Sequence, residues 1–179
     1  MQFSIFTGTG FTVLNASNAD VAGVELENFF ALTEHLRLGT SITWLDAEYG
    51  DGIPVEGLDN RELTQAPDWA WTVNLSYERP VTERLAGFFN ANWAYRGSHH
   101  VANDLHDKQS SYDLVGLQVG VRTLDGRWDV RAWCDNCFDK DYATGYFNQP
   151  FYFDDNLTQY QGQFLGPPRT WGVTLRMNF

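Results

Sequence analysis

Two stretches of this 179-residue chain carry side chains that could bind a ligand. The first, residues 97–107, holds His99, His100 and His106 together with two aspartates. Imidazole and carboxylate groups are ligands for iron and zinc, but no spacing here is diagnostic of a metal, and a solvated polar loop has the same composition. We therefore predict contact with a ligand for these three histidines, and neither a resident metal nor a cofactor.

Aromatic side chains mark the second stretch, residues 143–168. A long loop rich in aromatic residues suits a planar, partly apolar ligand, and packing against neighbouring loops would explain the same pattern. We predict that Phe151, Tyr152 and Phe153 contact the ligand. The wider aromatic group comprises Tyr146, Phe147, Phe151, Tyr152, Phe153 and Tyr160.

The carboxylates of residues 49–65 could bind Ca²⁺ through their oxygens, although a solvated acidic loop is the interpretation that we favour. They are Asp51, Glu56, Asp59 and Glu62. We find no Ser/His/Asp triad, no pair of catalytic carboxylates and no phosphate-binding loop in the sequence. We therefore predict that the chain is not an enzyme.

The two cysteines, Cys134 and Cys137, form a C-x-x-C pair. In an extended strand, residues three apart are separated by about 10 Å, which is too far for a disulfide unless a turn intervenes. With no βαβ pattern and no second pair nearby, we interpret them as structural or incidental thiols.

The chain is acidic, with a formal net charge of -11 and a pI of about 4.6. Nucleic acid is not an expected partner, because its phosphate backbone requires a cationic surface. A mean hydropathy of -0.37 and the lack of a long apolar run exclude a transmembrane helix. The first six residues have neither the basic nor the apolar region of a secretory signal.

Alternation of apolar and polar residues dominates the sequence. A period of two predicts strands with one apolar and one polar face, and the segments have the length of tilted membrane-spanning strands. Aromatic residues make up 16% of the chain, enough for girdles at two membrane interfaces. The alternating segments are residues 24–30, 36–44, 68–78, 84–96, 115–122, 127–132 and 171–179, with a partial eighth at 2–6.

The positions of the charged residues follow the same alternation. Within the strand centres they fall on the polar parity, and the exceptions Asp46, Asp113 and Arg169 lie at strand ends. A basic side chain at the bilayer midplane costs about 2–4 kcal/mol, so surrounding lipid would impose this pattern. A soluble sheet with one buried face also alternates, but four tryptophans would then have to fit one core.

Connections alternate between short ones (residues 32–35, 80–83 and 124–126) and long ones (51–65, 97–109 and 143–168). Outer-membrane barrels have short periplasmic turns and longer extracellular loops, which predicts that Phe179 lies on the periplasmic side. The last strand ends on an aromatic residue and resembles the signal read by the outer-membrane assembly machinery. Its apolar residues are Trp171, Val173, Leu175, Met177 and Phe179.

Six segments, in order along the whole chain, resemble motifs of TonB-dependent outer-membrane receptors of the siderophore-receptor type. Cys137 departs from the family pattern, which has an aliphatic residue there. The segments are residues 21–27 (G-x-E-x-E), 44–49 (the following strand), 66–69 (A-P), 93–97 (Y-R-G), 136–142 (N-L-F-D-x-x-Y) and 166–171 (P-R-T).

The resemblance implies an all-β, antiparallel transmembrane barrel of about 22 strands with a plugged lumen in the Gram-negative outer membrane. Residues 1–179 would supply its last seven to eight strands, forming an open curved sheet if alone, with unpaired edges near residues 2–6 and 171–179. The signal peptide, plug and early strands are expected to be missing. The implied partners are outer-membrane lipid, a ferric siderophore or similar nutrient, TonB through the missing plug, and the barrel assembly machinery.

Two alternatives come from other classes of protein. A complete small eight-stranded outer-membrane barrel, structural or adhesive, would need hydrogen bonding between its first and last strands. A soluble β-sandwich module that binds ligands through exposed tryptophans would be soluble without detergent.

Overall fold

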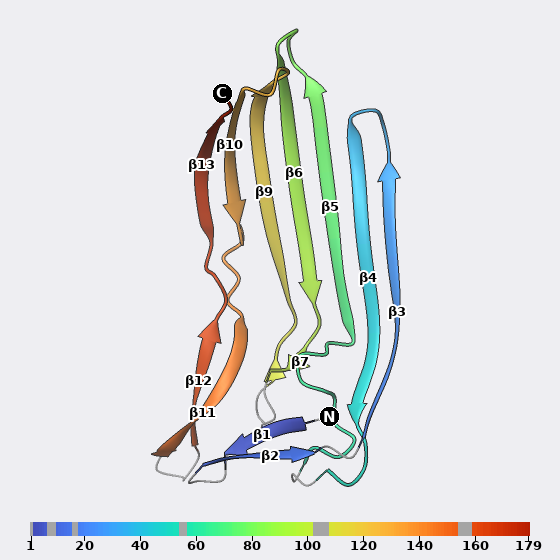
Figure 1. The fold of residues 1–179 in the computed structure, drawn as a ribbon, viewed down its shortest axis with the longest axis vertical. Coiled ribbons are helices and arrows are strands. Elements are labelled where there is room, and N and C mark those ends of the chain that lie inside the picture. Colours follow the sequence, from blue (N-terminus) through green and yellow to red (C-terminus); the bar gives the residue numbers. More distant parts are fainter. Residues whose placement is uncertain (1, 7–9, 16–17, 54–56, 102–107, 154–158) are drawn as a thin grey trace.

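The computed structural model describes residues 2–6, 10–15, 18–53, 57–101, 108–153 and 159–179, with side chains throughout except at 2–6, 11, 14–15, 147–153 and 159–161. One antiparallel sheet of seven strands dominates it, in the order β13-β10-β9-β6-β5-β4-β3 (Figure 1). The all-β prediction is confirmed. The strands are β3 (Ala19–Ala31), β4 (Leu36–Tyr49), β5 (Trp69–Pro80), β6 (Leu85–Arg96), β9 (Tyr112–Thr123), β10 (Trp128–Asp135) and β13 (Thr170–Met177).

Three separate hairpins complete the described structure. The first pairs β1 (Gln2–Phe6) with β2 (Phe11–Asn15), and the second pairs β7 (His99–His100) with β8 (Lys108–Gln109). The third pairs β11 (Ala143–Phe153) with β12 (Gln159–Leu165) inside what we predicted as a plain loop. None of the described residues forms a helix that is long and apolar enough to cross a membrane.

The open sheet is confirmed, but one predicted edge is wrong. The edge near the carboxyl terminus is β13, as predicted, whereas the other edge is β3 and not residues 2–6. Alternation at 2–6 correctly indicates a strand, yet that strand takes β2 as its partner and stays outside the sheet. β3 and β13 lie at opposite edges of the described sheet, so the pairing that a small closed barrel requires is not present.

The register places the predicted apolar residues on one face. Residues that pair across an antiparallel ladder point to the same side, and every second residue along a strand does so too. One row crosses four strands through Phe89, Val119, Ala132 and Val173. Through these ladders one side of the sheet, here called the apolar face, carries all eight residues that the alternation assigns to it. They are Trp71, Val73, Phe89, Trp93, Val119, Val130, Val173 and Leu175.

The apolar face is uncovered. Val119, near the middle of the sheet, is 56% exposed, and Trp171 on the edge strand is 78% exposed. No second layer of described strands packs on either side, so the soluble sandwich is not supported. A contiguous apolar surface of this kind requires another apolar environment, such as lipid.

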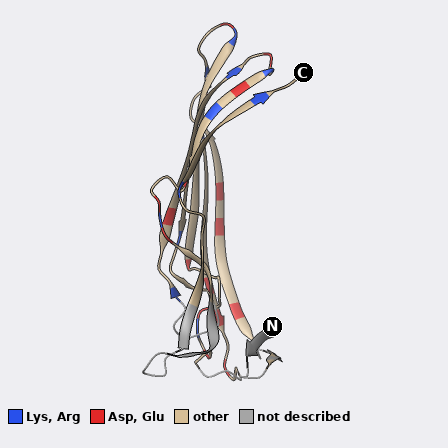
Figure 2. Ribbon diagram, turned by 90° about the vertical axis from the view of Figure 1, so that its left-hand side faces the viewer, with Lys and Arg blue, Asp and Glu red and all other residues tan. Residues whose placement is uncertain are grey.

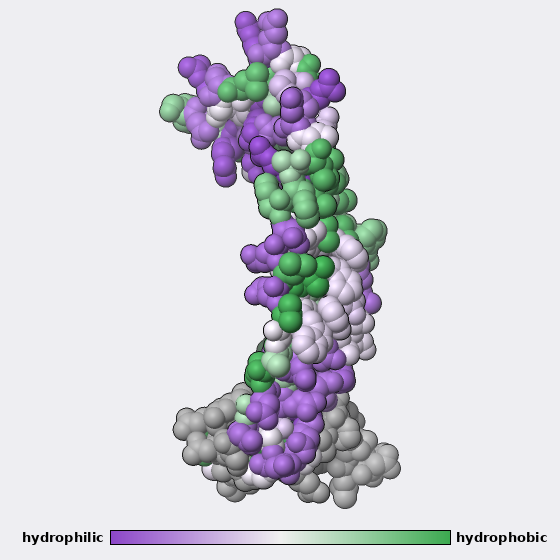
Figure 3. Space-filling model, turned by 90° about the vertical axis from the view of Figure 1, so that its right-hand side faces the viewer, coloured by the Kyte–Doolittle hydropathy of each residue, from purple (hydrophilic) through white to green (hydrophobic). Residues whose placement is uncertain are grey.

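Aromatic rings border the apolar face at both ends. At one end Trp71 stacks on Tyr95 with ring centroids 3.8 Å apart, and Trp93 meets Trp71 edge-on at 5.8 Å. At the other end Tyr77 pairs with Phe89. The strand from Trp71 to Tyr77 spans about 20 Å, close to the roughly 25 Å apolar band of outer-membrane barrels. Seen from the β3 side, hydrophobic residues gather in the middle of the molecule, between hydrophilic ends (Figure 3).

Short turns gather at one end of the sheet and long connections at the other (Figure 1). The carboxyl terminus lies at the short-turn end, where the Asn178 backbone N–H donates to the Arg127 carbonyl (2.9 Å) and its side-chain amide to the Gly126 carbonyl (2.7 Å). Charged residues on the apolar face lie near strand ends, as predicted. The register adds Asp20, Glu48 and Arg79 to them, each one residue from the end of its strand.

Candidate functional site at the long-loop end

Most fully buried side chains lie at the long-loop end, where the connection after β4 folds back on the sheet. Tyr49 and Leu58 are 1% and 0% exposed. The backbone N–H of Tyr49 donates to the Arg61 carbonyl and that of Leu63 to the Ala47 carbonyl, both at 2.8 Å. Asp59 accepts the Ile53 N–H at 2.8 Å, so this carboxylate of the acidic loop serves the loop's own backbone.

The loop after β6 doubles back through the β7–β8 hairpin, with His99 paired to Gln109. His99 is 1% exposed, and its Nδ1 lies 2.8 Å from the Gly97 carbonyl oxygen. Burial lowers the pKa of the His99 imidazole, because the charged form loses its hydration there. The neutral ring therefore packs at the base of the loop, 6.5 Å from the Tyr112 ring.

His100, Glu62 and Lys108 bring two long connections together. The Lys108 ammonium lies 3.1 Å from Glu62 Oε2, and His100 Nε2 lies 3.9 Å from the same oxygen. Burial is also the main cause that lowers the pKa of His100. The backbone N–H of Gln65 donates to the His100 carbonyl at 2.7 Å, which fastens the two loops directly.

The third long connection joins the same cluster. The Arg96 guanidinium donates to the Gln65 carbonyl at 3.0 Å and to its side-chain oxygen at 3.2 Å. The Ala143 backbone N–H, at the start of β11, donates to the Gln109 side-chain oxygen at 2.7 Å. Three connections far apart in the sequence are thereby held as one unit.

Tyr112 and Tyr142 stack with ring centroids 4.6 Å apart. Tyr142 also lies flat against Gly166, where an added Cβ would come within 2.0 Å of the ring, and its carbonyl accepts the Gly166 N–H at 2.8 Å. Burial raises the pKa of the Tyr142 phenol. Both ends of the last long connection therefore pack against the wall of the sheet.

A hollow of about 360 Å³ lies beside these contacts. It follows a row of paired residues across four strands, Thr43, Ala70, Arg96 and Tyr112, on the face opposite the apolar one. Ala70 and Ala94 line the bottom of the hollow with small side chains, and Arg96 and Tyr112 provide its polar groups. Apolar walls with a few convergent polar groups are typical of small-molecule sites.

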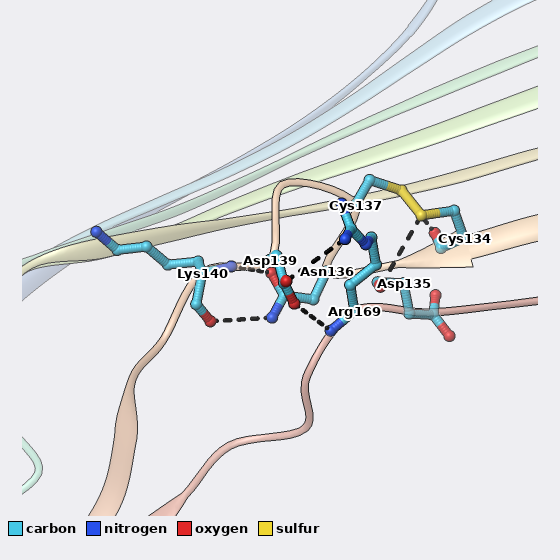
Figure 4. The surroundings of a disulfide bond; sticks show 7 residues. All are labelled: Cys134, Asp135, Asn136, Cys137, Asp139, Lys140 and Arg169. Carbon is cyan, nitrogen blue, oxygen red and sulfur yellow. Dashed lines mark hydrogen bonds and ion pairs between the residues drawn. A yellow bond between two sulfur atoms is a disulfide. The ribbon is translucent and has the colours of Figure 1, made fainter.

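A disulfide closes the turn that follows β10 (Figure 4). Cys134 and Cys137 have Cα atoms 5.5 Å apart, because the chain turns at Asn136, whose φ is 47°. Our interpretation of free thiols is therefore wrong, and the intervening turn that the spacing requires is present. A strand-like alternation up to residue 132 gives no signal for that turn.

The same turn ties the two ends of the last long connection together. The Asn136 side-chain amide donates to the Lys140 carbonyl (3.0 Å) and to the Pro167 carbonyl (3.1 Å). Asp139 accepts the backbone N–H of Arg169 at 3.0 Å. The motifs at 136–142 and 166–171 are therefore one hydrogen-bonded unit, built from segments about thirty residues apart.

The structure describes only some of the predicted ligand residues. His99 and His100 lie in the loop cluster, whereas His106 falls outside the described residues. Phe151, Tyr152 and Phe153 end strand β11, and their side chains are outside the described part. Among the described residues, no group of three or more His, Cys, Asp or Glu side chains is placed to hold a metal ion. Sequence reasoning missed Arg96, Tyr112 and Tyr142 as site residues. For Arg96 and Tyr112 the available signal was their place on the polar parity at strand ends that meet a long loop, and for Tyr142 it was the aromatic residue that closes the motif at 136–142.

A wide, single-layered antiparallel sheet with an uncovered apolar face, short turns at one end and long loops at the other defines the wall of a transmembrane β-barrel. Residues 1–137 match the family of TonB dependent receptor-like β-barrels, and the chain belongs to that family. Barrels of this family stand in the outer membrane of Gram-negative bacteria. In a barrel of this family the apolar side of the wall is the outer one, and the opposite side is here called the lumen face.

Solved structures of siderophore receptors share the fold. The ferric yersiniabactin uptake receptor FyuA of Yersinia pestis is 19% identical over 94% of this chain and 25% of its own, with a TM-score of 0.81. The ferric preacinetobactin receptor BauA of Acinetobacter baumannii is 18% identical over 99% of this chain and 26% of its own, with a TM-score of 0.72. This chain thus spans about a quarter of the length of each. No curated protein matches the sequence.

Proposed function

We propose that residues 1–179 are the carboxyl-terminal barrel wall of a longer TonB-dependent receptor that imports a ferric siderophore. The observation that carries this proposal is the loop cluster: three long connections meet at one end of a receptor-family barrel, beside a lumen-facing hollow with Arg96 and Tyr112. The siderophore receptors with the same fold favour iron as the cargo.

The short turns then face the periplasm and the long loops the outside. His100 and His106, with Phe151, Tyr152 and Phe153, contribute ligand contacts from the loops, and His99 supports them from beneath. A plug domain encoded with the rest of the receptor closes the lumen and connects to TonB. The last strand, through Trp171, Val173, Leu175, Met177 and Phe179, presents the assembly signal.

The test uses the complete receptor, identified by reading the DNA upstream of Met1 for an in-frame plug. Iron-starved cells that express it are given ⁵⁵Fe complexes of catecholate, hydroxamate and carboxylate siderophores, and binding in the cold is separated from uptake on warming. At least one complex should bind at the surface and enter in a TonB-dependent way.

Loop variants then locate the ligand contacts. His100→Ala with His106→Ala, and separately Phe151, Tyr152 and Phe153 to Ala, should weaken binding of that complex at least fivefold if they include a hot spot. His35→Ala, which changes the fourth histidine at the short-turn end, is the matched control. Unchanged affinity in both loop variants rejects the site, and lack of uptake of every ferric complex rejects the siderophore.

A further inference from the structure

A second hollow, of about 480 Å³, opens at the short-turn end of the sheet. The side chains of Tyr77, Phe89 and Val119, all on the lipid-facing side, border it. Gly87 leaves its floor without a side chain, and Val81 lies beside the gap, since a Cβ on Gly87 would come within 3.2 Å of Val81 Cγ2. The result is an apolar groove open toward lipid.

Arg79 stands at the rim of this groove. It pairs with Gly87 across the β5–β6 ladder, so its side chain lies on the lipid-facing side next to the gap. In the described part of the chain the Arg79 guanidinium makes no hydrogen bond or ion pair, and no other charged strand residue lies at this end of the lipid-facing side. A guanidinium there is stable only where it reaches an interface with polar or anionic groups.

The surrounding charge is positive. The chain as a whole carries -11, yet the short-turn end has more arginines than carboxylates, and Figure 2 shows basic residues gathered there. The basic residues of this end are Arg37, Arg79, Arg84, Arg122, Arg127, Arg131 and Arg176, and the acidic ones are Glu34, Glu78, Glu83, Asp125 and Asp129. Of the strand arginines at this end only Arg79 is on the lipid-facing side, so a headgroup would contact Arg79 directly and meet the others only through the net positive charge of this end of the wall.

We propose that this groove binds one anionic glycerophospholipid of the periplasmic leaflet. One acyl chain lies over Gly87 between Tyr77, Phe89 and Val119, and the phosphate accepts hydrogen bonds from the Arg79 guanidinium. Arg is suited to this role because its planar fork matches two phosphate oxygens. The choice of leaflet rests on the periplasmic position of the short turns in the proposed function, whereas the lipid chemistry does not depend on the cargo.

The test measures lipid binding by the complete receptor, delipidated in detergent, by native mass spectrometry. The probes are dioleoyl phosphatidylglycerol, dioleoyl phosphatidylcholine and glycerol 3-phosphate. Wild type should take up one phosphatidylglycerol several-fold more tightly than phosphatidylcholine. Glycerol 3-phosphate alone should neither bind nor compete, because the groove requires an acyl chain.

Two variants attack the groove independently. Arg79→Gln removes the charge, and loss of a charge-assisted hydrogen bond should weaken the first phosphatidylglycerol roughly tenfold. Gly87→Leu fills the floor and should weaken both lipids. Arg84→Gln, in the turn that follows β5, removes an equal charge outside the groove and should leave binding unchanged.

Equal phosphatidylglycerol binding by wild type and Arg79→Gln overturns the proposal, as does an Arg84→Gln loss that matches that of Arg79→Gln. Competition by glycerol 3-phosphate would identify a plain phosphate site instead. Siderophore uptake is not used in this test, so failure of the proposed cargo and failure of the lipid site are distinguishable.

Discussion

Arg122 reaches across strand β6 to bind Glu78: its Nε lies 3.1 Å from Glu78 Oε1, and its Nη2 contacts both carboxylate oxygens. The strand between them contributes Ala86, which pairs with Arg122 in the ladder and is 1% exposed. The small methyl group leaves room for the guanidinium to pass. The lumen face is therefore tied together over two strand spacings and not only between neighbours.

A double-mutant cycle on Glu78→Gln and Arg122→Gln measures the strength of this link. Both side chains are about half exposed, so water weakens the pair and we expect a coupling of about 0.2–1 kcal/mol in the free energy of unfolding. Ala86→Leu should cost more than either, because it blocks the path and overpacks a buried site. Denaturant unfolding of the receptor in lipid vesicles provides the measurement. A coupling of several kcal/mol would contradict the view that water weakens the interaction between Glu78 and Arg122.

Gly120 is required by its neighbours on the lumen face. An added Cβ would lie 2.5 Å from the Val130 carbonyl oxygen and 2.6 Å from Phe88 Cζ. The Phe88 ring lies 5.7 Å from the Arg131 guanidinium carbon, an arrangement in which the cation faces the ring. We expect Gly120→Ala to lower the free energy of unfolding by about 1–3 kcal/mol, as overpacking does.

Gly116 offers the matched control in the same strand and on the same face. Its added Cβ would meet nothing closer than 3.5 Å, an ordinary contact. Gly116→Ala should therefore be neutral, or stabilising by a few tenths of a kcal/mol through the unfolded chain. Equal destabilisation by both substitutions would show that the close approach at Gly120 has no energetic consequence.

Alternation and charge placement are sufficient to predict the seven strands, their faces and the ends at which turns and loops lie. The period of two fixes which side each residue takes, so Val73 and Trp93 could be placed together before any pairing was known. The period does not tell which strands pair with each other, and for that reason we placed β1 wrongly at the edge of the main sheet. The site was harder, because contacts such as Arg96 with Gln65 join residues 31 apart through loops without periodicity.

The pKa of His99 makes the β7–β8 hairpin sensitive to acid. An imidazole in the unfolded loop titrates near pH 6.5, and burial sets the folded pKa below that. Between the two values the open loop binds more protons than the closed one, so closure is favoured above pH 6.5 and weakens as pH falls. Amide hydrogen exchange at residues 97–101 should accelerate below pH 6.5, beyond its intrinsic pH dependence.

His99→Gln should remove that pH dependence while leaving some exchange protection, since the amide can still donate to the Gly97 carbonyl. His35→Gln at the opposite end is the control and should keep the response. Acid acceleration that persists in His99→Gln would assign the effect to another group, with His100 the next candidate because burial also lowers its pKa.

The disulfide between Cys134 and Cys137 stabilises a single turn. Loop-closure entropy for so short a ring corresponds to about 2 kcal/mol, and the Cys137 N–H still donates to the Val115 carbonyl at 2.9 Å. Replacing both cysteines by Ser should raise hydrogen exchange over residues 134–140 and leave the centre of the sheet protected. In the wild type, alkylation of both thiols should require prior reduction; alkylation without it would contradict the bridge.

Phe179 and Asn178 are neighbours at the end of the chain, but changes at these two positions should have different effects. Phe179 is fully exposed, whereas Asn178 makes two hydrogen bonds to the last short turn. Deleting Phe179 from the complete receptor should lower the fraction that reaches the outer membrane in a heat-modifiable, folded form, because the proposed assembly signal would lose its terminal aromatic. The molecules that do assemble should bind ligand with normal affinity.

Asn178→Ala keeps the terminal aromatic residue and should assemble normally, with a free energy of unfolding lower by about 1 kcal/mol. Normal assembly after loss of Phe179 would remove the assembly role from this end of β13.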